Sequence, residues 1–179
     1  MKEAEGSRDT GAVNCLSRTA AVITVSDRGA RGDREDVSGK LLCECLTAEG
    51  YSVEHYGVVP DEGEAIARIL RHLADDRKTA LILTTGGTGV APRDVTPEAT
   101  LSVVERVVPG MAEAMRQASL AKTPHAMISR GVAGIRGRSL IVNLPGSPRG
   151  AVENLQVILP ALLHALKKIQ GDPSDCAEV

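Results

Sequence analysis

Residues 80–99 read ALILTTGGTGVAPRDVTPEA, an apolar run that passes into a glycine cluster and then into an arginine and an aspartate. The opening run, residues 80–85, is short and apolar and stops at glycine, which is typical of a strand buried on both faces. Thr96 with Pro97 and Glu98 predicts a helix start, because threonine can cap, proline suits the first turn, and an acid favours the positive end of the helix dipole. A buried strand, a glycine loop and a helix in this order indicate an α/β domain.

Similar apolar runs recur along the chain and end in polar or glycine-containing segments. They predict further strands at residues 20–26, 51–59 and 139–144. Helical patterns predict helices from Asp36 to Gly50, after residue 62, and over 96–108, 111–121 and 151–169. This alternation predicts one α/β domain with a mainly parallel sheet over residues 19–171. Residues 1–18 lack periodicity and are expected to form a disordered extension, and residues 172–179 a C-terminal tail.

The composition excludes several classes of function. The 179 residues suit one domain, and the absence of Phe and Trp removes aromatic platforms for base stacking. With 21 basic and 23 acidic side chains and no run of like charge, the sequence argues against a nucleic-acid partner. No apolar run approaches the roughly 20 residues that span a bilayer, and the N-terminus lacks a signal-peptide core. A cytoplasmic protein with no membrane partner and four reduced cysteines is expected.

Ligands of open α/β sheets bind beyond the carboxyl ends of the strands, so the residues after each predicted strand are the candidates for a site. These segments carry acids or glycine turns, and they are residues 26–28, 60–62, 86–89 and 145–148. Glycine turns expose backbone N–H groups that can bind anions. Taken alone, each turn is better explained as a simple chain reversal.

The glycine loop fits neither of two widespread phosphate-binding motifs. A Walker loop requires Gly-Lys-Ser/Thr where the chain has Ala91-Pro92-Arg93, and Pro92 replaces the third glycine of a dinucleotide fingerprint. An NAD-dependent oxidoreductase would rest only on that incomplete fingerprint. Arg93 and Asp94 instead suit a nucleoside triphosphate with Mg²⁺, because arginine and backbone N–H groups bind phosphates and a carboxylate binds the metal.

The motifs together resemble a known family. They are TTGGTGVAPRDVTPEA at 84–99, VSDR at 25–28, DVSG at 36–39, VPDE at 59–62, ISRG at 128–131 and NLPGSP at 143–148. In this order the chain resembles the molybdenum cofactor biosynthesis proteins of the MogA type, the molybdopterin adenylyltransferases, which are similar to the G domains of gephyrin. The resemblance implies a three-layer α/β/α fold and commonly a homotrimer. It also implies transfer of AMP from Mg-ATP to the terminal phosphate of molybdopterin, with release of pyrophosphate.

The resemblance also implies site residues. Asp61 and Asp94 match the two acids of the family's active centre and are predicted to be catalytic and to hold the metal. The predicted nucleotide and phosphate contacts are Gly86, Gly87, Thr88, Gly89, Arg93, Pro145, Gly146 and Ser147, and the predicted pterin contacts are Ser26, Asp27, Ser129 and Arg130. Structural alternatives remain open: Asp61 as a helix cap, Arg93 as a surface arginine, and Asp94 as a partner of Arg93 or of backbone N–H groups.

Two functions follow from the resemblance. One is the enzyme, favoured by the presence of both aspartates, and the other is a non-catalytic pterin-binding or scaffolding module of the same fold. The molybdate-inserting protein of the same pathway is a possible partner. A homotrimer is expected because Met111, Met115 and Leu120 give their helix more apolar surface than a lone surface helix needs. We further predict one pocket containing the glycines, Asp61, Asp94 and Ser147.

Overall fold

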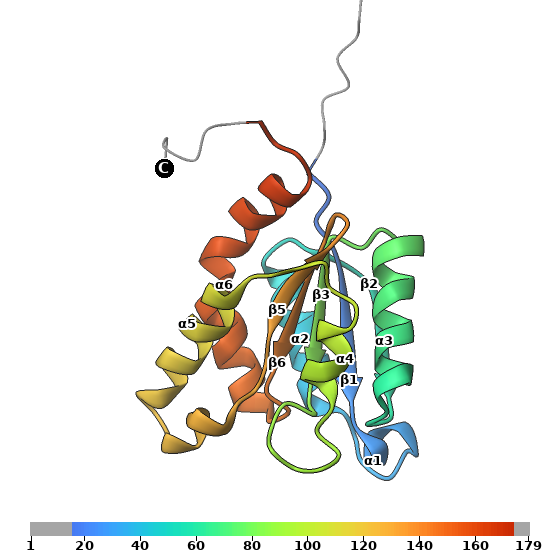
Figure 1. The fold of residues 1–179 in the computed structure, drawn as a ribbon, viewed down its shortest axis with the longest axis vertical. Helices are drawn as coiled ribbons and strands as arrows, with labels where there is room; N and C mark the ends of the chain where they lie inside the picture. The colour runs from blue at the N-terminus through green and yellow to red at the C-terminus, as the bar shows by residue number, and fades with distance from the viewer. Residues whose placement is uncertain (1–15, 174–179) are drawn as a thin grey trace, which may run out of the picture.

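A six-stranded sheet organises the chain (Figure 1), of which we describe residues 16–173 from a computed structural model. The strand order is β2-β1-β3-β6-β5-β4. β1, β2, β3 and β6 are parallel, whereas β5 runs antiparallel to β6 and β4 antiparallel to β5. The strands are β1 (Thr19–Val25), β2 (Ser52–Val59), β3 (Leu81–Thr85), β4 (Arg106–Val107), β5 (Ala133–Arg136) and β6 (Ser139–Leu144).

Helices cover both faces of this sheet, as Figure 1 shows, which confirms the expected three-layer α/β/α architecture. One face carries α2 (Val37–Ala48), α5 (Pro109–Leu120) and α6 (Pro148–Ile169). The other carries α3 (Gly63–Arg71), which continues into a π-helical turn η1 (His72–Asp76), and α4 (Thr96–Leu101). The short helices α1 (Asp27–Ala30) and η2 (Pro124–Ile128, 3₁₀) lie in connections.

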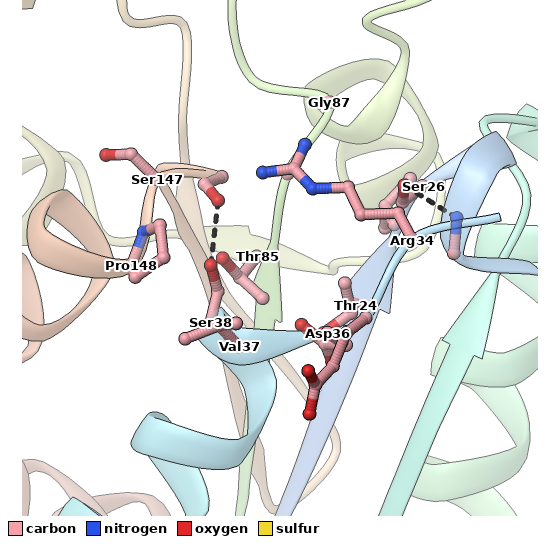
Figure 2. Close-up of a pocket in the computed structure, with 15 residues that line it drawn as sticks. Thr24, Ser26, Arg34, Asp36, Val37, Ser38, Thr85, Gly87, Ser147 and Pro148 are labelled. Carbon is pink, nitrogen blue, oxygen red and sulfur yellow. Dashed lines mark hydrogen bonds between the residues drawn. The ribbon is translucent and has the colours of Figure 1, made fainter. Parts of the chain in front are cut away.

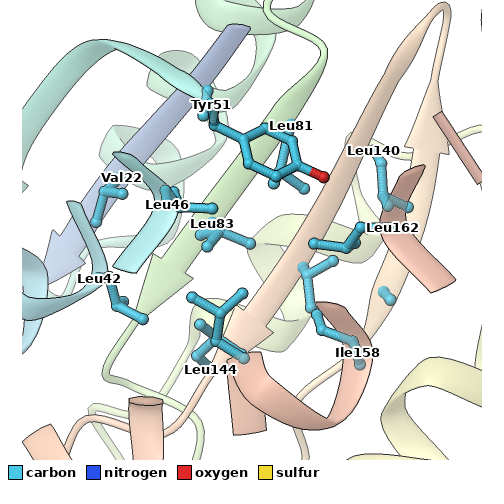
Figure 3. Packing of buried hydrophobic residues seen from close by; sticks show 14 of the residues in the cluster. Val22, Leu42, Leu46, Tyr51, Leu81, Leu83, Leu140, Leu144, Ile158 and Leu162 are labelled. Atoms are coloured by element: carbon cyan, nitrogen blue, oxygen red, sulfur yellow. The ribbon is translucent and has the colours of Figure 1, made fainter. Parts of the chain in front are cut away.

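Two hydrophobic layers form because successive strand residues point to opposite faces. On β3, Leu83 packs with α2 and α6, while Ile82 packs under α3 and α4. Figure 3 shows the first layer, to which Leu42 of α2 and Leu162 of α6 both contribute. With no Phe or Trp available, aliphatic side chains fill both layers, and the central strands are buried throughout.

The two ends of the described chain are tied together at the end of the sheet where β1 begins. Ser17 N donates to Gln170 Oε1 and Gln170 Nε2 donates to Ser17 O, both at 2.8 Å. Leu16 packs against the core beside them. Residues 1–15 of the predicted extension and 174–179 of the predicted tail lie outside the described residues. No helix within residues 16–173 is long and apolar enough to cross a membrane.

The structure corrects several local expectations. Thr96 does not cap α4: Val95 is the N-cap, and Thr96 is fully buried with its hydroxyl donating to Gly86 O at 2.9 Å. The final helix starts at Pro148, and Ser147 is its N-cap. Strands β4 and β5 and helix α1 were not predicted.

Candidate functional site

Two glycine turns lie side by side at the carboxyl ends of β3 and β6. Gly86 has φ +101° and Gly87 φ +62°, a region that side chains rarely adopt. A Cβ atom on Gly86 would lie 2.3 Å from Val25 O, and one on Gly146 would lie 3.1 Å from the Gly86 Cα. The turns therefore pack backbone against backbone, and only glycine fits there.

Hydroxyl groups fix the turn after β6 to its neighbours. Thr85 Oγ1 donates to Pro145 O at 2.6 Å. Ser38 Oγ donates to Gly146 O at 2.8 Å, as Figure 2 shows. Ser147 Oγ accepts from Gly150 N at 3.2 Å and so caps α6. Because the carbonyl groups of Pro145 and Gly146 are hydrogen-bonded, this turn is held in one conformation.

Two cavities meet at these turns. The first, of about 410 Å³, lies over the end of β1 and the start of α2, and we call it the β1-side cavity. The second, of about 430 Å³, lies against α5, η2 and the start of α6, and we call it the α5-side cavity. Gly87, Gly146 and Ser147 line both. Either volume falls in the range of small-molecule sites, so each cavity is large enough for a small ligand.

Asp27 and Asp61 lock the ends of β1 and β2 together. Asp27 N donates to Asp61 Oδ2 at 2.7 Å, and Asp61 N donates to Asp27 Oδ1 at 3.0 Å. Arg93 closes on Asp27 through Nη2, at 2.8 and 2.7 Å from the two carboxylate oxygens. The Arg93 guanidinium holds the pKa of Asp27 below its ordinary value, whereas burial raises the pKa of Asp61. Arg93 thus has a carboxylate partner rather than a purely solvated surface position.

Asp61 and Asp94 approach the glycine turn from different sides. Asp61 Oδ1 lies 3.3 Å from the position of a Cβ on Gly87, and the charge of Asp94 adds to the rise in the pKa of Asp61. Asp61 does not cap α3, because Glu62 is the N-cap and makes no side-chain bond there. Asp94 lines the α5-side cavity, and its Oδ2 accepts from Ala91 N at 2.8 Å. The predicted single pocket is thus two adjoining cavities, and Asp61 lies behind Gly87 rather than in the lining of either.

Arg130 supports the glycine loop from beneath. Its Nε donates to Gly89 O at 2.6 Å, Nη2 donates to Asp94 O, and Nη1 pairs with Glu98. Its backbone N donates to Thr88 O at 2.9 Å. These bonds occupy the guanidinium, so the contacts favour a loop-supporting position over the predicted pterin contact.

The remaining predicted residues divide between the two cavities. Ser26 and Gly86 line the β1-side cavity, and Thr88, Gly89, Ser129 and Pro145 line the α5-side cavity. Ser26 also caps α1, with Oγ accepting from Gly29 N at 3.1 Å. All of the predicted site residues therefore lie at one end of the sheet, but the predicted pterin set is divided: Ser26 and Ser129 line different cavities, and Asp27 and Arg130 line neither.

Several polar residues of the site were not predicted. Asp36 was predicted only as a helix cap, which it is, but its carboxylate also accepts from Thr24 Oγ1 at 2.6 Å and Tyr56 Oη at 2.7 Å. Asn143 is buried and donates to Thr84 and Thr100, both at 2.9 Å. The DVSG and NLPGSP motifs contain Asp36 and Asn143 and were the available signal. Further unpredicted lining residues are Arg34, Arg116, Ser119, Lys122, Thr123, His125 and Asn154.

The acids present fit a hard cation only if a ligand completes its coordination. Within residues 16–173 there is no group of three or more His, Cys, Asp or Glu side chains that could hold a metal. Asp61 and Asp94 each use one carboxylate oxygen, Oδ2, in a hydrogen bond to the backbone. Mg²⁺ commonly binds through one or two carboxylates plus substrate phosphates and water. The donor set therefore suits Mg²⁺ arriving with a nucleotide.

The comparisons with known proteins agree with this arrangement. The family described as "Probable molybdopterin binding domain" matches residues 21–164. The chain is 43% identical over 155 residues to a molybdopterin adenylyltransferase of Helicobacter pylori, covering 84% of this chain and 87% of that protein. It is 45% identical over 165 residues to gephyrin of Dictyostelium discoideum, covering 85% of this chain and 22% of that protein.

A solved structure extends the likeness to three dimensions. The molybdopterin biosynthesis enzyme MoaB of Thermus thermophilus is 52% identical, with a TM-score of 0.82 over 88% of this chain and 99% of that one. A structure of MogA gives 41% identity and a TM-score of 0.80, over 84% and 99% of the two chains. The chain therefore belongs to the family of probable molybdopterin-binding domains that includes the molybdopterin adenylyltransferases.

Proposed function

We propose that the protein is a molybdopterin adenylyltransferase of molybdenum cofactor biosynthesis, which transfers AMP from ATP to the terminal phosphate of molybdopterin and releases pyrophosphate. The observation that carries the proposal is the pair of cavities that share Gly87, Gly146 and Ser147. A transfer between two bound substrates needs their reacting groups held together at a common boundary. The shared wall of glycines, which presents backbone N–H groups rather than side chains, is such a boundary for phosphates.

Asp61 and Asp94 flank that boundary, and we propose that they hold Mg²⁺ with the phosphate chain of ATP. The metal would supply positive charge that offsets the charge on the reacting phosphates. The chain itself supplies rigidity, because the Asp27–Asp61 lock and the Arg93–Asp27 pair fix one acid, and the Arg130 bonds fix the loop that carries the other. The attacking phosphate is already anionic, so a strong general base is not required.

Incubation of the protein with molybdopterin, ATP and MgCl₂ tests the function. We expect adenylyl-molybdopterin and pyrophosphate in equal amounts by mass spectrometry and a pyrophosphate assay, with neither formed when molybdopterin or Mg²⁺ is omitted. Binding of molybdopterin without any adenylyl product would instead support the non-catalytic module. A change in the NAD spectrum on addition of protein would reopen the oxidoreductase hypothesis. The structure argues against it, because a dinucleotide-binding loop leads directly into a helix, whereas here α4 begins only at Thr96, well beyond the glycines.

We also propose that copies of the chain associate into a homotrimer. Met111 and Met115 are buried in the monomer's own core and cannot contribute, which corrects part of the basis for the expectation. Leu120, the third residue of that set, is exposed as expected, and Met127 (72% exposed), Ile128 and Val107 are further exposed apolar side chains. Sedimentation equilibrium at micromolar concentration should give three times the monomer mass, and a Met127→Glu variant should shift it toward the monomer. The product would then pass to the protein that inserts molybdate.

A further inference from the structure

The connection between α1 and α2 carries an arginine, Arg34, that the proposed reaction has not yet used. Its charged neighbours have partners: Arg31 pairs with Asp33 at 3.0 Å, and Glu35 pairs with Lys40 at 2.7 Å. Within residues 16–173, Arg34 makes neither an ion pair nor a side-chain hydrogen bond. Arg34 is thus the charged side chain of this connection that is left available to a ligand.

The Arg34 side chain is directed into the site. It lines the β1-side cavity together with Gly87 and Ser147. Figure 2 shows it extending from its loop across the cavity toward the side where Ser147 lies, with the guanidinium group on the side of Gly87, although the residue stays exposed. A side chain so placed faces whatever occupies the cavity.

The loop that carries Arg34 is held at both of its ends. Asp33 N donates to Arg28 O at 2.8 Å, and Gly32 N donates to Gly29 O at 3.0 Å. On the other side, Asp36 accepts from Gly39 N at 2.9 Å and from Thr24 Oγ1 at 2.6 Å. These bonds hold the backbone on both sides of Arg34, so the side chain starts from a fixed point at the edge of the cavity.

The wall opposite Arg34 also favours an anion. It includes the backbone of Gly87 and Gly146, and it continues into the N-terminus of α6, a 22-residue helix. Glycine N–H groups and a helix N-terminus both carry partial positive charge. A guanidinium group facing them can bind phosphate through two parallel hydrogen bonds.

We propose that Arg34 binds a phosphate group of a substrate in the β1-side cavity and thereby sets the affinity of the protein for that substrate. The inference rests on the proposed function for the identity of the substrates, ATP and molybdopterin, either of which carries a phosphate. Arg34 makes this contact from the loop side, while the glycine turns make it from the sheet side. It positions substrate and takes no part in the bond exchange.

Substitution of Arg34 by alanine tests the proposal, with Arg31→Ala as the matched control. Both variants remove one positive charge from the same exposed loop, but Arg31 does not line the cavity. Loss of a charge-assisted phosphate contact should weaken binding by roughly tenfold to a hundredfold. Arg31→Ala should bind as the wild type does, and Arg34→Lys should recover only part of the loss because lysine lacks the planar fork.

The ligands distinguish the two phosphate sources. Calorimetry should use ATP, AMP, inorganic pyrophosphate and molybdopterin separately, each with and without Mg²⁺. A loss confined to ATP and pyrophosphate identifies the β- and γ-phosphates, and a loss confined to molybdopterin identifies the pterin phosphate. In steady-state assays the variant should raise KM for that substrate while leaving kcat within about twofold, as expected when uniform binding is removed.

Failure of this inference is separate from failure of the proposed function. If Arg34→Ala binds every ligand and turns over as the wild type does, Arg34 has no role and the enzyme stands. If the wild type forms no adenylyl-molybdopterin, the function is wrong, and pyrophosphate binding by the two variants still tests Arg34. An equal loss in Arg34→Ala and Arg31→Ala would overturn the proposal, because it would show only a long-range charge effect.

Discussion

Asp61 and Asp94 belong to one site but are held by very different means. Asp61 follows strand β2 directly and is bound to Asp27 in both directions, through bonds of 2.7 and 3.0 Å. Asp94 is carried by the long loop between β3 and α4, where Ala91 N and the underlying Arg130 hold it. The sheet therefore fixes one acid, and a shaped loop brings the second acid to it.

This difference means that the two acids depend on different parts of the structure. At the end of the sheet, Asp61 is half-buried and burial raises its pKa. A pKa shifted in this way is typical of residues at functional sites. The loop depends on glycines in rare conformations and on one arginine beneath it. Loss of either acid should lower activity, and changes at the sheet end should also alter how stability depends on pH.

The largest effect is expected for Asp94→Asn. Asparagine keeps the size of the side chain and an oxygen for Ala91 N, but it removes the charge proposed to hold Mg²⁺. Single-turnover adenylyl transfer should fall about a hundredfold or more, because each ~1.4 kcal/mol of lost transition-state stabilisation is roughly tenfold. The melting temperature should change little. Asp33→Asn, an exposed acid paired with Arg31, is the control, and a lower melting temperature with unchanged turnover would make Asp94 a structural residue.

Gly87→Ala should give the next largest effect, seen in stability. The new Cβ would lie 2.4 Å from Thr96 Oγ1, in a backbone conformation of φ +62°. Gly32→Ala provides the control, because Gly32 has φ +80° with nothing within 4 Å. Urea unfolding should show about 1–2 kcal/mol lost in the control from backbone strain alone, and roughly 1–3 kcal/mol more in Gly87→Ala from crowding. Equal losses would show that the loop moves aside freely.

Asp61→Asn should lower adenylyl transfer as Asp94→Asn does, because the same metal loses a charge, and its effect on stability should be smaller and dependent on pH. Folding raises the pKa of Asp61 above 3.8, so its ionised form opposes folding, and the opposition is complete above the raised pKa and absent below 3.8. The asparagine variant should melt at a slightly higher temperature than the wild type near neutral pH. The difference should shrink as the pH falls toward 3.8. A variant that melts lower at every pH would mean that the lock to Asp27 outweighs the cost of burying the charge.

The smallest effect is expected for Arg93→Ala. The Arg93 guanidinium is the main reason that the pKa of Asp27 is depressed. Stability from this pair is present above the ordinary pKa of aspartate and is lost as the pH falls through the depressed value. Because the pair is largely exposed, unfolding should change little. NMR titration of the Asp27 carboxyl carbon should show its pKa rise toward the ordinary value in Arg93→Ala and stay depressed in Arg28→Ala.

The parallel part of the sheet was predictable because its strands are buried on both faces and read as apolar runs. Strands β4 and β5 were not, since they span two and four residues and exist through antiparallel pairing that begins at β6. No local sequence pattern predicts the pairing of such short strands. Thr96 was assigned as a cap from its neighbours, but the close approach of Gly87 buries it instead.

The position of the site was predictable, but the pairing of its side chains was not. Parallel strands bring their carboxyl ends to one edge, which placed Asp61, Gly87 and Ser147 together despite their distance in sequence. The bond network of Arg130 joins residues from separate segments through carbonyl groups, which every residue carries. In the sequence, nothing distinguishes Arg34 from other loop arginines. Only the folded structure places it in the lining of the β1-side cavity.

The bonds between Ser17 and Gln170 have a consequence for building larger proteins. They bring the entry and exit of the domain together at the end of the sheet remote from the glycine turns, one helix length away along α6. A neighbouring domain joined at either end, or an insertion of this domain into another chain through both ends, would leave the two cavities open. The gephyrin relative, of which the matching segment makes up 22%, is consistent with such modular use. For the same reason, affinity tags or surface tethers attached near Ser17 or Gln170 should not block the two cavities.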